Sequence, residues 1–71
     1  MKYCYYTNRG STLCGVRPTK GFVEMRLFGK EVYIESASTL ARGVLIYDRC
    51  LTLKECHHCH LKLGGVDYLR Y

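Results

Sequence analysis

Hydrophobic and polar residues alternate most regularly between positions 22 and 36. The segments Phe22–Phe28 and Glu31–Ser36 each alternate with a period of two, which is typical of strands with one buried face. Gly29-Lys30 lies between them, and glycine at the first position of a two-residue loop favours a type II′ turn. We therefore expect a β-hairpin whose core face pairs Leu27 with Val32.

A second hairpin is predicted at the N-terminus. Tyr3–Thr7 and Ser11–Cys14 are rich in β-branched, aromatic and cysteine residues, and the three-residue loop Asn8–Gly10 between them ends in glycine. Pairing across this loop places Cys4 opposite Cys14. Directly opposed residues have Cβ atoms about 4.5–5.5 Å apart, which is close enough to share a metal ion or to form a disulfide.

The C-terminal half contains a short strand and a helix. Residues 36–43 fit a loop or a single helical turn, and Val44–Asp48 reads as a short buried strand. Thr52 and Glu55 then match the capping box T-x-x-E, which predicts a helix from Leu53 to Leu63 that ends at the glycines in positions 64 and 65. The predicted fold is a small α+β domain of two β-hairpins, a short strand and one C-terminal helix.

Length and cysteine content bear on how this fold is stabilised. The chain has 71 residues, so we expect one domain spanning residues 1–71 with a thin core, and such domains usually add a metal, a disulfide or a partner subunit. Neither an apolar leader segment nor a membrane-length apolar run is visible. We expect a cytoplasmic protein without a membrane partner, where clustered cysteines more often bind metal than form disulfides.

The motif Cys56-His57-His58-Cys59-His60 fits two metal templates. It matches C-x-x-C-H, which attaches c-type haem, and C-x-x-C, which is half of a four-ligand zinc site. Haem attachment takes place in an export compartment and needs helices around the cofactor, whereas most of this chain reads as strand. We therefore expect one structural Zn²⁺ held by the paired cysteines of the first hairpin and the helix, with other cysteine and histidine side chains as alternatives. The expected ligands are Cys4, Cys14, Cys56 and Cys59, and the alternatives are Cys50, His57, His58 and His60.

These four cysteines and the order of elements resemble the zinc-ribbon and treble-clef group of small zinc-binding domains. In that group a β-hairpin supplies one ligand pair and a second pair lies at or near a helix. The chain departs from the pattern at its first pair, because Cys4 and Cys14 are separated by nine residues, while the group carries a tight C-x2-C or C-x4-C knuckle.

No arrangement of residues typical of an enzyme is present. Serine, histidine and aspartate do not occur at triad spacing, there is no phosphate loop, and the carboxylate nearest the histidines, Glu55, is assigned to the capping box. A chain this short also leaves little room for both a core and a pocket. We expect binding rather than catalysis.

Charge and aromatic content indicate the kind of partner. The net charge is +5, and seven tyrosines are interleaved with cations, a combination that suits single-stranded nucleic acid because bases stack on rings and cations neutralise phosphates. The expected nucleic-acid-binding residues are Arg9, Arg17, Lys20, Arg26, Lys30, Tyr5 and Tyr33. The alternative is an adaptor or inhibitor that docks on an acidic protein surface, for example by adding a strand at a sheet edge. A homodimer through the same edge is a third hypothesis.

Overall fold

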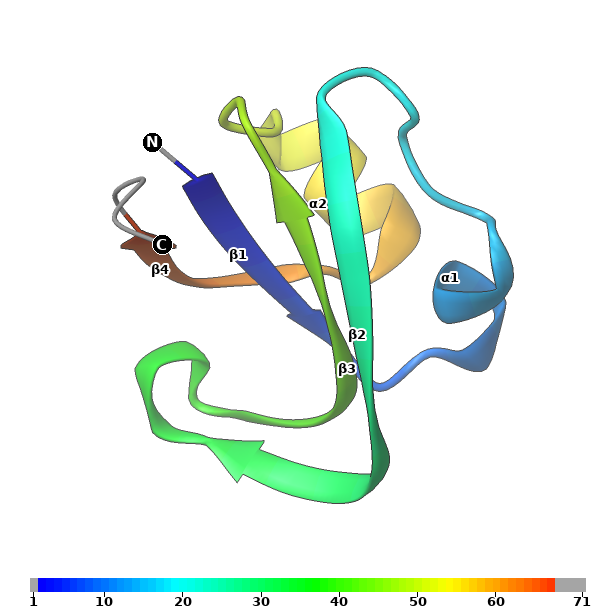
Figure 1. Ribbon diagram of the computed structural model, residues 1–71, viewed down its shortest axis with the longest axis vertical. Coiled ribbons are helices and arrows are strands. Elements are labelled where there is room, and N and C mark those ends of the chain that lie inside the picture. The colour runs from blue at the N-terminus through cyan, green and yellow to red at the C-terminus, as the bar shows by residue number, and fades with distance from the viewer. Residues whose placement is uncertain (1, 68–71) are drawn as a thin grey trace.

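A four-stranded antiparallel sheet and two short helices make up residues 2–67, the part of the chain that the computed structural model describes (Figure 1). In chain order the elements are β1 (Lys2–Thr7), α1 (Gly10–Cys14), β2 (Phe22–Ile34), the 3₁₀ turn η1 (Glu35–Ala37), β3 (Thr39–Tyr47), α2 (Leu53–Cys59) and β4 (Lys62–Asp67). The strand order is β2-β3-β1-β4, so the two strands of each β-α-β unit are separated by a strand of the other unit. The expected α+β class is confirmed. Neither helix within residues 2–67 is long and apolar enough to cross a membrane.

The main core lies between the sheet and the helices. Tyr5, Leu45 and Tyr47 project from the two central strands, and the rings of Tyr5 and Tyr47 pack edge to face with centroids 5.9 Å apart. Leu51 and Cys59 close over them from the segment that contains α2. Because side chains alternate along a strand, only every second residue of β1 and β3 reaches this core.

A smaller apolar cluster lies on the opposite face of the sheet. Cys4, Val44 and Ile46 are buried there, although this face carries neither α1 nor α2. The far end of the β2–β3 hairpin bends sharply, so that η1 packs beside β4 (Figure 1). The bend brings Ser36 next to Gly64 of β4, which gives this face part of its cover.

The predicted N-terminal hairpin is wrong in its second strand. Residues 11–14 form most of α1, while β1 is flanked on one side by β3 and on the other by β4. Both edges of β1 are therefore filled, and the segment after it has no place in the sheet. Cys4 pairs with Ile46 and Gly65, not with Cys14.

The predicted hairpin at Gly29-Lys30 is also wrong, although both of its strands exist. Residues 22–34 form the single strand β2, which pairs with β3 along both halves: Leu27 lies opposite Gly43 and Val32 opposite Ala41. The residues around Gly29 form a wide irregularity in the ladder instead of a turn, and the positive φ of 78° at Gly29 occurs within it. The chain reverses instead at η1, which begins six residues after Gly29.

The helix predicted for residues 53–63 begins where expected but ends early. It stops at Cys59, because His60 adopts a left-handed conformation with φ 57° and the N–H of Leu61 bonds back to the Cys56 carbonyl. The next residues form β4, which fills the free edge of β1. Gly64 therefore lies in a strand instead of ending the helix, and a side chain there would collide with the ring of Tyr6.

Candidate functional site

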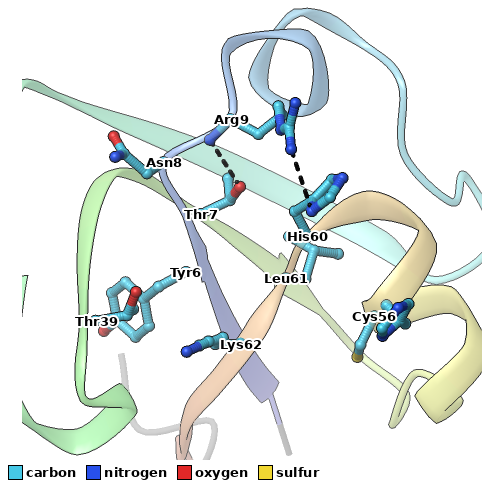
Figure 2. A pocket seen from close by; sticks show the side chains of 10 residues that line it. Tyr6, Thr7, Asn8, Arg9, Thr39, Cys56, His60, Leu61 and Lys62 are labelled. Atoms are coloured by element: carbon cyan, nitrogen blue, oxygen red, sulfur yellow. Dashed lines mark hydrogen bonds between the residues drawn. The ribbon is translucent and has the colours of Figure 1, made fainter.

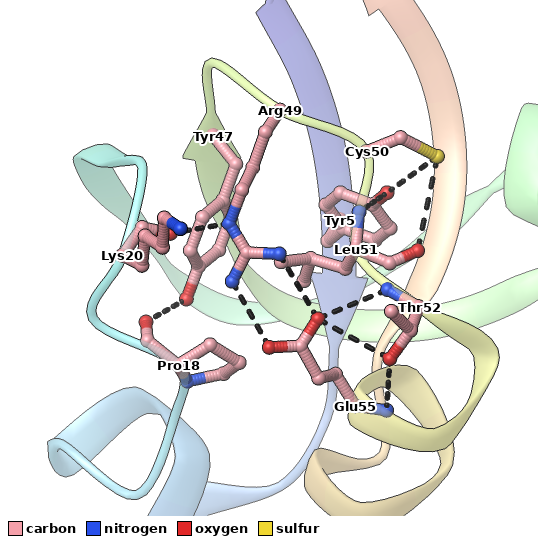
Figure 3. Close-up of polar contacts among 9 residues, drawn as sticks. All are labelled: Tyr5, Pro18, Lys20, Tyr47, Arg49, Cys50, Leu51, Thr52 and Glu55. Carbon is pink, nitrogen blue, oxygen red and sulfur yellow. Dashed lines mark hydrogen bonds and ion pairs between the residues drawn. The ribbon is translucent and has the colours of Figure 1, made fainter.

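The start of α2 is held by a capping box and an ion pair (Figure 3). The Thr52 hydroxyl accepts a hydrogen bond from the Glu55 N–H at 3.1 Å, and the Glu55 carboxylate accepts one from the Thr52 N–H at 3.0 Å. Arg49 donates to both carboxylate oxygens of Glu55, at 3.0 and 2.9 Å. These hydrogen bonds, with Arg49 first, lower the pKa of Glu55 to about 2.

The opposite end of α2 is tied to α1. The buried Thr12 of α1 donates a 2.7 Å hydrogen bond from its hydroxyl to the carbonyl of Cys59, the last residue of α2. The next residue, His60, has its Nδ1 3.4 Å from a guanidinium nitrogen of Arg9. Two residues 51 positions apart are thus brought together at one end of the sheet.

Arg9 and His60 border a hollow of about 620 Å³ (Figure 2). It opens between the end of β1, the start of β3 and the segment that joins α2 to β4. The residues that line it are Tyr6, Thr7, Asn8, Arg9, Thr39, Cys56, His57, His60, Leu61 and Lys62. The charged groups that line it are cationic: Arg9 and Lys62 are both exposed. The rings of His57 and His60 are exposed as well, and Thr7, Asn8 and Thr39 add hydroxyl and amide groups to the lining.

A second hollow of about 390 Å³ begins at Gly10, the residue after Arg9. Lys30 and Arg42 line it, and both side chains are exposed. Arg9, Lys30, Arg42 and Lys62 come from four separate segments that are far apart in sequence, and we call this set the basic end.

The five cysteines do not gather at one place. Cys4 lies in the apolar cluster on one face of the sheet, whereas Cys56 and Cys59 belong to the core on the other face. Cys14 is exposed beside the second hollow, and Cys50 is exposed in the loop before α2. Within residues 2–67, no group of three or more cysteine, histidine or acidic side chains is placed to hold a metal ion.

The helix cysteines are better suited to packing than to metal binding in this conformation. Cys59 is only 5% exposed and packs against Leu51 and Leu61. Burial raises the pKa of both the Cys56 and the Cys59 thiols, which favours the neutral thiol over the thiolate that zinc requires. The four cysteines expected to form one Zn²⁺ site thus do not fit it here, and zinc binding stays a prediction from the sequence.

Three of the predicted phosphate-binding cations have other contacts or lie elsewhere. Arg17 donates two hydrogen bonds to backbone carbonyls of α1 and stacks over Phe22, with its guanidinium carbon 4.7 Å from the ring centroid. Arg26 pairs with Glu24 at 2.9 Å. Lys20 is exposed, but it lies near the C-terminal end of β3, where its carbonyl accepts a hydrogen bond from Arg49.

The two predicted stacking tyrosines have different environments. Tyr5 is 1% exposed and belongs to the main core, so the expectation that it contacts nucleic acid is wrong. Tyr33 is 60% exposed and lies opposite Leu40 at the far end of the β2–β3 hairpin. The sheet therefore does not offer the row of exposed rings that its tyrosine content suggested.

Arg42 and Lys62 were not among the binding residues predicted from the sequence. Each stands in a segment expected to have another structure, Arg42 in a loop or helical turn and Lys62 in the helix. In the sequence, each of these cations begins or interrupts a run of strand-forming residues. That pattern does not indicate which strands are neighbours in the sheet, and so it does not place the cations together.

Comparisons of the chain with protein families, with curated proteins and with solved structures found no match.

Proposed function

We propose that the protein is a binding module that holds the phosphate backbone of single-stranded nucleic acid at its basic end. The observation that carries this proposal is the convergence of Arg9, Lys30, Arg42 and Lys62 around two adjoining hollows. Exposed cations that are spread over a surface can contact successive phosphates of a polyanion. They suit one small anion less well, because they do not converge on a single point.

The larger hollow has the size and lining for a nucleotide. Its volume of about 620 Å³ falls within the range typical of small-molecule sites. Arg9 and Lys62 supply charge for phosphate, and the histidine rings offer flat surfaces on which an unpaired base can stack. Thr39 and the side-chain carbonyl of Asn8 supply hydrogen-bonding groups, while the amide nitrogen of Asn8 donates to Glu31 at 2.6 Å. A base pair inside a duplex does not expose its face, so these contacts favour a single strand.

Neither zinc nor the tyrosine-rich sheet enters this proposal. Tyr5 is buried, Arg26 already pairs with Glu24, and the cysteines are spread over both faces of the sheet. Of the residues expected to bind nucleic acid, Arg9 and Lys30 belong to the proposed surface.

The test is fluorescence anisotropy with a labelled single-stranded oligonucleotide at several salt concentrations. We expect affinity to fall steeply with salt, and Arg9→Ala and Lys62→Ala each to weaken binding and to reduce the salt slope by about 0.7. Lys20→Ala is the matched control, since it removes an exposed cation near the C-terminal end of β3. An equal loss of affinity in all three variants would show net charge acting without a site, and absence of binding at low salt would refute the proposal.

A further inference from the structure

Strand β2 forms one edge of the sheet, and apolar and charged residues alternate along it. The strand order ends at β2, whose outer side has no strand partner within residues 2–67. Val23 and Leu27 are 40% and 64% exposed along this edge. The Arg26 carbonyl faces Gly43 of β3. Because backbone groups alternate in direction along a strand, the N–H and C=O groups of Met25 and Leu27 point outward, away from β3.

The sequence of this edge is complementary to itself when reversed. Around Met25, Phe22-Val23-Glu24 precedes and Arg26-Leu27-Phe28 follows. In an antiparallel pair of two copies centred on Met25, glutamate meets arginine and valine meets leucine. The phenylalanines take no part in this pairing, because Phe22 packs on the main core while Phe28 packs on the opposite face of the sheet. We infer that β2 pairs with β2 of a second copy of this chain, with a two-fold axis at Met25.

The pairing of opposite charges favours this register over registers that are shifted along the strand. Glu24 and Arg26 already form a 2.9 Å ion pair within one strand, which shows that their side chains share a face. The dimer brings the same two residues of the second copy opposite them, so that four charges alternate in sign. A slip that keeps side chains on the same faces centres the pair on Glu24 or on Arg26 and sets like charges directly opposite each other, which is destabilising.

The interface is short. The irregularities of the β2–β3 ladder at Val23 and after Leu27 limit the regular part of the edge to residues 24–27. The outward backbone groups of Met25 pair with those of Met25 of the second copy across the two-fold axis, and Val23 covers Leu27 of the second copy at both ends. An edge of this length buries less than a standard interface of about 1,600 Å², so we expect a dissociation constant on the order of micromolar.

The experiment is sedimentation velocity of the full chain from about 5 to 500 µM, a range that brackets micromolar affinity. Arg26→Glu and Glu24→Arg each place like charges in register, and we expect each to weaken the dimer about tenfold or more. The double variant Glu24→Arg/Arg26→Glu restores alternation and should dimerise like the wild type. An equimolar mixture of the two single variants should form a heterodimer.

The charge reversals separate this interface from other modes of association. Circular dichroism of each variant checks that the fold is kept, and the double variant and the mixture test the pairing even where a single change is destabilising. A wild-type chain that stays monomeric at the highest concentration would overturn the inference. So would a dimer that ignores Arg26→Glu, which would point to the β4 edge, or a double variant that remains monomeric.

Discussion

The hydroxyl of Tyr5, in the centre of the sheet, accepts a 2.8 Å hydrogen bond from the backbone N–H of Leu51, in the loop before α2. The same hydroxyl donates to the sulfur of Cys50 at 3.7 Å (Figure 3). A single buried ring thus fixes the segment that leads into the helix. Desolvation by burial is the main reason that the pKa of Tyr5 is raised to about 12.

We predict that Tyr5→Phe destabilises the protein by about 1–3 kcal/mol, because the ring remains while the buried N–H of Leu51 loses its acceptor. Urea unfolding followed by circular dichroism measures the change. Tyr33→Phe is the matched control, since Tyr33 is largely exposed, and it should change stability by less than about 0.5 kcal/mol. Equal effects of the two substitutions would contradict the role of the hydrogen bond.

Alkaline pH should destabilise the fold through the same residue. The pKa of Tyr5 is about 12 in the folded state and about 10 when the chain unfolds, so the unfolded state loses its proton first. The stability that Tyr5 contributes is fully present below pH 10 and declines as the pH rises towards 12. The measurement is the urea midpoint across this range, in which Tyr5→Phe should show a shallower decline than the wild type.

Low pH should destabilise the fold by protonating Glu55. Its folded pKa of about 2 lies below its ordinary value, so its contribution is present above about pH 4.5 and is lost as the pH falls towards 2. Thermal unfolding at a series of pH values should show a flatter acid limb for Glu55→Gln than for the wild type. Glu35→Gln, at an exposed position of η1, provides the comparison and should retain the wild-type slope.

Thiol reactivity should follow burial. Cys14 and Cys50 are exposed and should react with iodoacetamide in the native protein, whereas Cys4 and Cys59 should react only after unfolding. Timed alkylation with mass spectrometry of the peptides gives the order. Joint protection of Cys4, Cys14, Cys56 and Cys59, with one zinc ion in the native mass spectrum, would instead support the four-cysteine site expected from the sequence.

Gly43→Ala should destabilise the fold by about 1–3 kcal/mol. A Cβ at this position would lie 2.9 Å from the Arg26 carbonyl oxygen, and the backbone of β2 cannot move aside cheaply. Gly10→Ala is the matched control, because nothing lies within 4 Å of a Cβ there. Chemical denaturation of both variants checks the prediction, and a Gly43→Ala protein as stable as the control would contradict the tight pairing of β2 with β3.

Local features of the fold could be predicted from the sequence because neighbours along the chain create them. The capping box of Thr52 and Glu55 requires only the first turn of α2, and both of its hydrogen bonds are present. Residues 3–7 and 44–48 were predicted as strands from their composition, and all of them except Asp48 lie in the central strands of the sheet. Alternation in residues 22–28 and 31–36 likewise predicted extended structure, and residues 22–34 form β2.

Only the tertiary structure decided which strands pair. Gly29-Lys30 has the chemistry of a tight turn, yet β2 gains more by pairing with β3 along both halves than by folding back on itself. Residues 62 and 63 were predicted to end the helix, with Gly64 and Gly65 after it, whereas residues 62–67 form a strand that pairs with the free edge of β1. Arg9, Lys30, Arg42 and Lys62 converge through these same pairings. Alternation and capping thus determined the local conformation from the sequence itself, whereas the sheet order and the basic end depended on burial and hydrogen bonding between segments far apart in the chain.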